Sequence, residues 1–130
     1  LHLCLRRQRQ MCIRDRAEAV QISTPTARIA LAYAASDLVL QLSDKPEAFG
    51  RTVVEALSVG RPVLGWDHGG VGELLQQLQP SGAVPLGDAR ALGERALALL
   101  AQPPSLPTRI PFTLQAMQRD TLRLYADLAG

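Results

Sequence analysis

Residues 37–75 read DLVLQLSDKPEAFGRTVVEALSVGRPVLGWDHGGVGELL, and this stretch decides the fold. It contains two short apolar runs, at 37–42 and 62–65, each followed by a loop and then by a helical pattern. Such runs are typical of parallel strands that are buried on both faces. Because strands that alternate with helices indicate βαβ units, we predict an α/β fold, a Rossmann-like parallel sheet with helices on both faces.

The segments around this stretch continue the alternation. Gly60 and Asp88 are typical residues for the end of one helix and the start of another. The proline-rich segment 103–111 is expected to be a linker. We predict helices at 26–36, 50–59, 71–79, 89–101 and 112–128, and a third strand at 83–86.

Three of the predicted helices carry apolar residues at helical spacing, and we expect these faces to pack inward. The faces are Val53, Ala56 and Leu57 in the helix at 50–59, Leu92, Ala96, Leu99 and Leu100 in the helix at 89–101, and Leu114, Met117, Thr121, Leu124, Tyr125 and Leu128 in the helix at 112–128.

Composition excludes several classes of protein. The chain has 130 residues, of which 47% are hydrophobic and 20% charged, a mixture typical of one globular domain. The sequence has no apolar run of about 18 residues, which a membrane-spanning helix needs. Aromatic residues make up only 4%, which argues against a single-stranded nucleic-acid groove built on stacking.

The first 16 residues, LHLCLRRQRQMCIRDR, differ from the rest. They carry five arginines, one aspartate and both cysteines, whereas residues 17–130 have nine basic and eleven acidic residues. The ending MCIRDR resembles translated adapter sequence, so we interpret residues 1–16 as a non-native or disordered tail. A native basic arm that binds nucleic acid or a membrane is the alternative, and the apolar stretch of a signal peptide is missing.

The loops after the first two strands are the candidate site, because ligands of open parallel sheets bind beyond the carboxyl ends of the strands. Gly50 opens a helix whose first N–H groups lack intrahelical partners and whose dipole adds about half a positive charge. Such a helix start suits phosphate or sugar hydroxyl oxygens. Glu47 precedes this helix and Glu55 lies inside it, and two carboxylates beside an anion site suggest a ligand with both phosphates and hydroxyls, namely a nucleotide sugar.

Both loops also allow simpler interpretations. Arg51 and Glu55 are spaced to pair on a solvated helix face, which would leave Glu47 an ordinary loop residue. In the second loop, Gly69 and Gly70 precede a helix and again offer N–H groups to an anion. A glycine-rich turn is weak evidence on its own, however, and a tight turn is an equal alternative.

Other residues of the second loop carry less information. His68 is a loop histidine or a polar contact in the cleft; a metal role is disfavoured, because adjacent Asp67 is its only potential co-ligand at suitable spacing. Trp66 is expected in the core or in the wall of the cleft. Glu73 lies in the first turn of a helix, where its charge favours the dipole, and we interpret it as structural.

A family resemblance is carried by PEAFGRTVVEALSVGRPVLGWDHGGVGELL, residues 46–75. This segment resembles the C-terminal lobe of retaining glycosyltransferases of the GT-B fold, in the GT4 type known as glycosyl transferases group 1. The resemblance extends over residues 26–101. The positions that match the family pattern are Glu47, Phe49-Gly50, Glu55-Ala56, Gly60, Pro62-Val63, Gly69-Gly70 and Glu73.

The resemblance implies a role for each matching site residue. Glu47 would lie beside the transferred sugar, accept hydrogen bonds from its hydroxyls and stabilise the charge that develops at the anomeric carbon. The implied reaction is sugar transfer with retention from a nucleotide-sugar donor to a glycan or lipid-linked glycan, with no cofactor or bound metal. Donor binding would use the amides of Phe49, Gly50 and Arg51, the Glu55 carboxylate for the ribose, and Gly69 and Gly70 for the floor near the donor.

One departure from the family pattern matters. The family neutralises the leaving diphosphate with an Arg and a Lys from an earlier loop, and nothing upstream of residue 26 supplies them. We therefore expect residues 17–102 to be a partial donor-binding lobe, inactive alone and with an unpaired sheet edge, followed by the linker 103–111 and a helix at 112–130.

The same resemblance sets the expected surroundings of the protein. We expect a cytoplasmic location and peripheral association with the inner face of the membrane through the missing lobe, and the net negative charge of residues 17–130 argues against a nucleic-acid partner. A non-catalytic nucleotide- or phosphate-binding α/β module is the alternative function.

Overall fold

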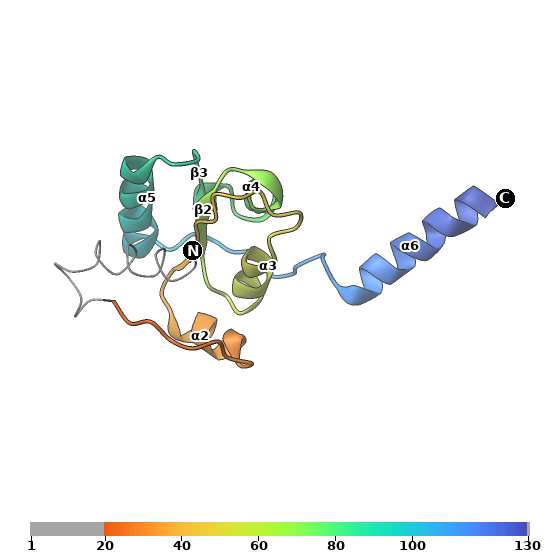
Figure 1. The fold of residues 1–130 in the computed structure, drawn as a ribbon, viewed down its shortest axis with the longest axis horizontal. Helices are drawn as coiled ribbons and strands as arrows, with labels where there is room; N and C mark the ends of the chain where they lie inside the picture. The colour runs from red at the N-terminus through yellow and green to blue at the C-terminus, as the bar shows by residue number, and fades with distance from the viewer. Residues whose placement is uncertain (1–19, 130) are drawn as a thin grey trace, which may run out of the picture.

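The computed structural model describes residues 20–129, so the predicted tail at 1–16 lies outside the described residues. The predicted alternation of helices and strands is confirmed (Figure 1). In chain order the elements are α2 (Ile29–Ala35), β1 (Val39–Gln41), α3 (Arg51–Ser58), β2 (Val63–Trp66), α4 (Gly69–Leu78), the 3-10 helix η2 (Pro80–Gly82), β3 (Ala83–Val84), α5 (Ala89–Ala101) and α6 (Leu114–Ala129).

The three strands form one parallel sheet in the order β1-β2-β3. Val39 of β1 lies opposite Val63 of β2, and the register continues to Gln41 opposite Gly65. Within residues 20–129, β1 has β2 as its only neighbour, and Leu40 on that edge strand is 51% exposed. This part of the chain therefore has the unpaired sheet edge that we expected.

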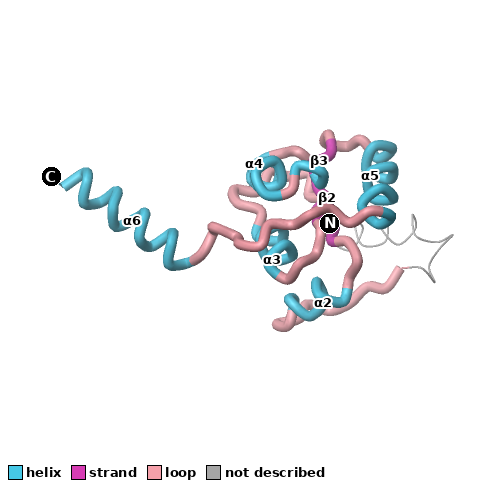
Figure 2. Tube along the Cα trace, turned by 180° about the vertical axis from the view of Figure 1, so that it is seen from behind, coloured by secondary structure: helices cyan, strands magenta, loops and turns pink. Residues whose placement is uncertain are grey.

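Helices cover both faces of the sheet, as predicted, with α3 and α4 on one side and α5 on the other (Figures 1 and 2). Alternate strand residues point to opposite faces, so Val63 packs toward α3 and α4 while Leu64 packs toward α5. The buried cluster on the α3 and α4 side, the α3/α4 core, consists of Val39, Val53, Ala56, Leu57, Val63, Val71, Leu74 and Leu75. The cluster on the other side, the α5-side core, consists of Leu64, Trp66, Val84 and Leu99.

Some boundaries differ from the prediction. Helix α4 begins at Gly69, two residues before the predicted start at Val71, so the glycine pair belongs to the helix. Strand β2 extends one residue beyond the predicted run 62–65, because Trp66 pairs with Val84 of β3. Leu100, which we expected to point inward, is 51% exposed, since α5 has only the sheet on its inner side.

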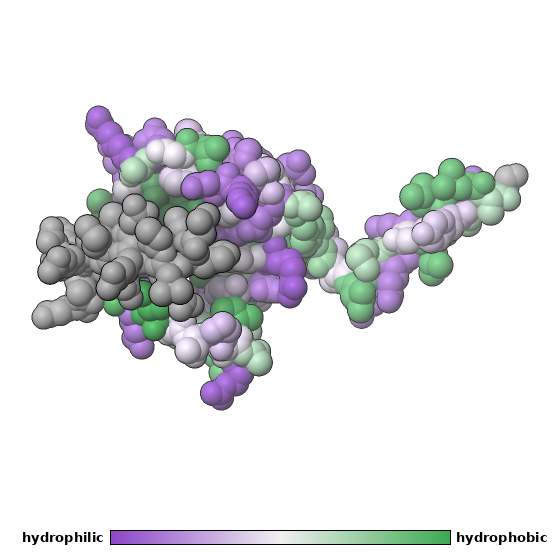
Figure 3. Space-filling view, in the orientation of Figure 1, coloured by the Kyte–Doolittle hydropathy of each residue, from purple (hydrophilic) through white to green (hydrophobic). Residues whose placement is uncertain are grey.

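The segment 103–111, which we expected to be a linker, runs along the core, since Leu106 and Ile110 pack against the α3/α4 core. Helix α6 extends away from the rest of the chain, and apolar side chains show along it (Figure 3). None of its residues is buried, so its predicted packing face has no partner within residues 20–129. No helix in this described part is both long and apolar enough to cross a membrane.

Candidate functional site

The two predicted site loops lie against each other, beyond the carboxyl ends of β1 and β2. The backbone N–H of Gly70 donates to the carbonyl oxygen of Glu47 at 2.7 Å. A Cβ atom on Gly70 would lie 2.7 Å from both the Ala48 carbonyl oxygen and the Phe49 nitrogen, closer than real Cβ atoms approach. The first turn of α4 therefore packs directly on residues 46–49, and a side chain at Gly70 would separate them.

This contact changes what the glycines do. The sequence suggested that the Gly70 N–H could bind an anion. In the structure this N–H already donates to the Glu47 carbonyl, so it is not available to an anion. At Gly50, the side chain of Val71 in α4 lies 3.0 Å from where a Cβ would be, so α4 also packs against this glycine. Gly50 and Gly69 also have positive φ angles, +75° and +55°, which favour glycine for backbone reasons alone.

The same packing brings the starts of α3 and α4 together. Each start contributes about half a positive charge from the helix dipole, so the two fields add at the edge of the sheet. Within residues 20–129, no hydrogen-bond acceptor is found for the backbone N–H groups of Phe49, Gly50 and Arg51. Gly50 itself is buried, whereas Phe49 and Arg51 are exposed. The mouth of α3 is thus partly open and carries unpaired donors.

Glu47 is held at both its main chain and its side chain. Its carbonyl oxygen accepts from Gly70, and its carboxylate oxygen Oε1 accepts from the Nε2 amide of Gln41. Gln41 is the last residue of β1, and both side chains are half-buried. Sequence reasoning missed Gln41. The signal was there, because this glutamine interrupts the apolar run DLVLQL at the carboxyl end of a predicted strand.

Glu55 makes the ion pair that the simpler interpretation predicted. Its Oε1 lies 2.8 Å from Nη2 of Arg51, one helical turn earlier on α3. The Arg51 side chain is 83% exposed and the Glu55 side chain 34% exposed. An exposed pair of this kind contributes only about 0–1 kcal/mol to stability. The pair therefore neither explains the fold nor shields Glu55 from a ligand.

Two hollows adjoin the mouth of α3, and Phe49 lines both. Its ring meets the ring of Phe112 edge to face, with centroids 5.6 Å apart and planes at 80°. The smaller hollow, about 140 Å³, includes Glu73 of α4. The larger, about 670 Å³, lies between Arg51 and the start of α6. The site thus borders an open groove that the C-terminal segment helps to form.

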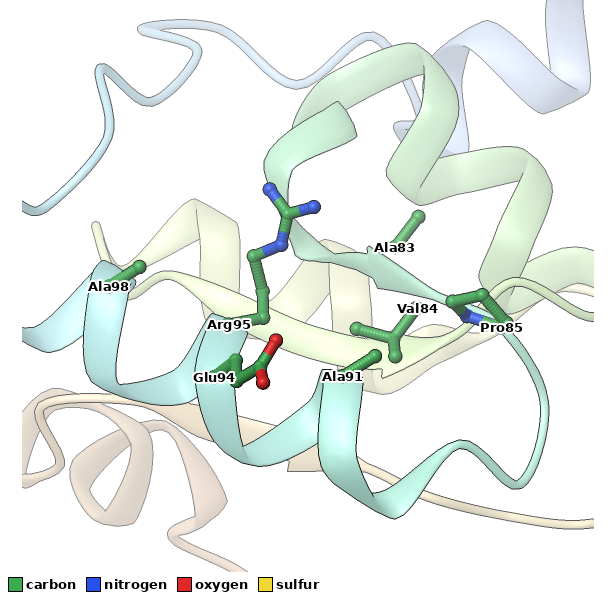
Figure 4. A pocket seen from close by; sticks show the side chains of 7 residues that line it. All are labelled: Ala83, Val84, Pro85, Ala91, Glu94, Arg95 and Ala98. Carbon is green, nitrogen blue, oxygen red and sulfur yellow. The ribbon is translucent and has the colours of Figure 1, made fainter.

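A further hollow of about 300 Å³ lies elsewhere, between β3 and α5 (Figure 4). Its lining contains none of the predicted site residues. Glu94 at its edge is paired with Arg90 of the same helix at 2.9 Å. The lining residues are Ala83, Val84, Pro85, Ala91, Glu94, Arg95 and Ala98.

Trp66 and His68 lie at the two ends of the short segment between β2 and α4. Trp66 is 7% exposed and belongs to the α5-side core. Its indole nitrogen has no hydrogen-bond partner in the described part of the chain. His68 precedes α4 in an extended conformation and makes no side-chain capping bond. Among residues 20–129, no group of three His, Cys, Asp or Glu side chains is arranged to hold a metal ion.

Comparison with known proteins adds two findings. The family described as "Glycosyl transferases group 1" matches residues 15–111, which include both loops and the whole sheet. The chain is also 36% identical, over 72 residues, to an N-acetyl-alpha-D-glucosaminyl L-malate synthase of Bacillus anthracis. That match covers 55% of this chain but only 19% of the relative's length, so it concerns about a fifth of that protein.

Proposed function

The chain belongs to the glycosyl transferases group 1 family, and from this we propose that it forms the donor-binding part of a retaining glycosyltransferase. The donor is a nucleotide sugar, and the sugar passes to an acceptor such as a glycan or a lipid-linked glycan. Acceptor binding belongs to parts of the protein beyond residues 20–129.

The observation that carries the proposal is the placement of Glu47. Its carboxylate accepts from Gln41 at the end of β1, and its carbonyl oxygen accepts from Gly70 in the first turn of α4, so it lies where the two loops meet. A carboxylate there can accept hydrogen bonds from sugar hydroxyls. It can also stabilise positive charge at the anomeric carbon as the bond to the diphosphate breaks.

The neighbouring groups fit the rest of a nucleotide sugar. The unpaired amides of Gly50 and Arg51, with two helix dipoles behind them, suit diphosphate oxygens. Glu55, one turn further along α3, presents a partly exposed carboxylate that suits two vicinal ribose hydroxyls. The amides lie at the start of α3 and Glu55 lies one turn later. This spacing supports a diphosphate bound at the helix start with the ribose next to it along the helix.

The test is Glu47→Ala in the full-length protein. We expect the turnover number for sugar transfer to fall by at least about 100-fold, since a preorganised charge near the reacting carbon is lost. Nucleotide affinity, measured by calorimetry, should stay within about threefold, because Glu47 faces the sugar and not the nucleotide. Nucleotide-activated N-acetylglucosamine as donor and L-malate as acceptor are the first probes, because the name of the Bacillus anthracis relative contains both groups.

Glu94→Ala is the matched control, because Glu94 is an exposed glutamate on α5, away from both loops. It should change neither transfer nor nucleotide binding. Nucleotide binding without any sugar transfer by the wild-type protein would instead favour a non-catalytic nucleotide-binding module. Unchanged transfer in Glu47→Ala would contradict the role proposed for this residue.

A further inference from the structure

The side-chain amide of Gln41, the last residue of β1, donates to the Glu47 carboxylate. The proposed function gives this amide no role. Val39 points into the α3/α4 core, and Gln41, two residues later, is on the same face of the sheet. Its partner in the register is Gly65, and side chains of α4, Val71 and Leu75, fill the space where a side chain at Gly65 would lie. A half-buried amide at this place needs a hydrogen-bond partner, and Glu47 supplies it.

We propose that Gln41 is a positioning residue for Glu47, an inference that rests on the proposed function. An ionised carboxylate only accepts hydrogen bonds, so the amide meets it with its nitrogen. The bond selects one orientation of a side chain that otherwise has many rotamers. Because the donor is neutral, it orients the carboxylate without cancelling its charge, as an arginine or lysine would. The negative charge stays available for the sugar.

The main chain of Glu47 is fixed independently. The Gly70 N–H holds the Glu47 carbonyl at 2.7 Å, whatever residue occupies position 41. Loss of the Gln41 amide should therefore release the carboxylate while the loop stays in place. This separation distinguishes a positioning role from a merely structural one, which would affect the loop, the nucleotide and the fold together.

The first test uses Gln41→Leu, which keeps the side-chain volume and removes the donor. In the full-length protein, kcat should fall about 10- to 100-fold, the usual effect of losing a hydrogen bond to a charged group. KM for the donor and the unfolding midpoint should change little. In a Glu47→Ala background the same substitution should have no further effect on kcat, because Gln41 acts only through Glu47.

Gln76→Leu is the matched control. The Gln76 amide of α4 also donates to a carboxylate, that of Asp67, at 3.0 Å, and it is exposed. This variant should leave kcat unchanged. Equal losses of kcat in the two glutamine variants, or a parallel loss of nucleotide affinity in Gln41→Leu, would overturn the positioning role.

Gln41→Glu gives a signature that a structural role would not produce. Two carboxyl groups in contact share a proton, which raises the upper pKa of the pair. While that proton is bound, the new carboxyl group donates to Glu47 as the amide did. Above the raised pKa both groups are charged and repel each other. We expect kcat of this variant to fall with rising pH in a range where wild-type kcat is constant, while Gln41→Leu stays low throughout.

Other titratable residues belong to the loop of Glu47 and to the neighbouring elements, and all remain in every variant, so comparison with wild type removes their contribution. They are Asp44 and Lys45 in its own loop, Arg51 and Glu55 on α3, Asp67 and His68 before α4, and Glu73 within α4.

The contact can also be observed without any activity. In the 15N-labelled chain, one side-chain amide proton of Gln41 should be shifted downfield, and Glu47→Ala should abolish the shift. Absence of the shift would overturn the inference and leave the proposed function standing. If the wild-type protein transfers no sugar, the proposed function fails and the positioning role with it, while the amide signature remains.

Discussion

At the scale of single residues, Glu55 fits two interpretations, an ion pair with Arg51 and a contact to the ribose of the donor. The two residues pair at 2.8 Å on the surface of α3, as i and i+4 spacing predicts. The Glu55 side chain nevertheless remains 34% exposed, next to the mouth that we propose binds the donor. The ion pair and the ribose role are therefore compatible, and they make different predictions for stability and binding.

Glu55→Ala should separate these contributions. The free energy of unfolding should change by less than about 1 kcal/mol, because the pair is exposed. Nucleotide affinity should fall about tenfold, the effect of losing a charged acceptor for hydroxyl groups. Urea denaturation and calorimetry measure the two quantities.

Glu94→Ala provides the comparison, since Arg90 and Glu94 form the same kind of i and i+4 pair on α5. It should reproduce the small change in stability with no change in affinity. If the two variants bound nucleotide equally well, Glu55 would have no part in donor binding.

At the scale of elements, the packing of α4 on the loop after β1 shapes the site. Gly70 allows the first turn of α4 to touch Ala48 and Phe49, and its N–H holds Glu47. The close approach also brings the positive ends of two helices together. A glycine that looked like part of a ligand-binding turn in the sequence is thus a packing residue that aligns two other parts of the site.

Gly70→Ala should disturb this alignment. The added methyl group would meet backbone atoms at 2.7 Å, and backbone cannot move aside as a flexible side chain can. We expect the protein to be destabilised by about 1–3 kcal/mol, with weaker nucleotide binding. Urea denaturation and calorimetry on the same samples test both effects.

Gly93→Ala in α5 is the control, because nothing lies within 4 Å of its hypothetical Cβ. This exposed helix position should be stabilised by about 0.5–1 kcal/mol. A stabilising effect of Gly70→Ala would show that α4 does not press on the loop.

At the scale of the whole molecule, the C-terminal segment divides into two parts. Residues 103–112 run back over the α3/α4 core, where Phe112 meets Phe49 at the edge of the site. Beyond them, α6 leaves the core, with Leu124 57% and Leu128 75% exposed. The first part therefore belongs to the folded unit that positions the site, whereas α6 adds no burial to it.

Phe112→Ala and Leu128→Ala should show this division. Phe112→Ala should cost about 1–2 kcal/mol of stability, because it removes a partly buried ring and an edge-to-face contact. Leu128→Ala should change stability by less than about 0.5 kcal/mol. The urea concentration at the unfolding midpoint measures the change in stability of each variant, provided that the m-values are equal. Similar losses in both variants would mean that α6 packs on the core in solution.

Most of the fold was predictable because its signals are local. The spacing of Val53, Ala56 and Leu57 identified a buried helix face, and these three are at most 2% exposed. Asp88 indicated the start of α5, where its side chain accepts from the N–H of Ala91 at 2.9 Å. Apolar runs between helices were sufficient to predict a parallel sheet, because such strands are buried on both faces.

The candidate site was predictable only in part. The residue order located two loops at one edge of the sheet, and the roles of Glu47 and Glu55 toward a donor stay predictions. Gln41 and Glu47 are six positions apart, and Gly70 is 23 positions beyond Glu47, so no periodicity links them. The exposed stripe of α6 likewise has the pattern of a packing face, and only the path of the chain shows that nothing within residues 20–129 covers it. Helical and strand periods are set by each segment's own backbone, whereas these contacts exist only after the β1 and β2 loops have been brought together by folding.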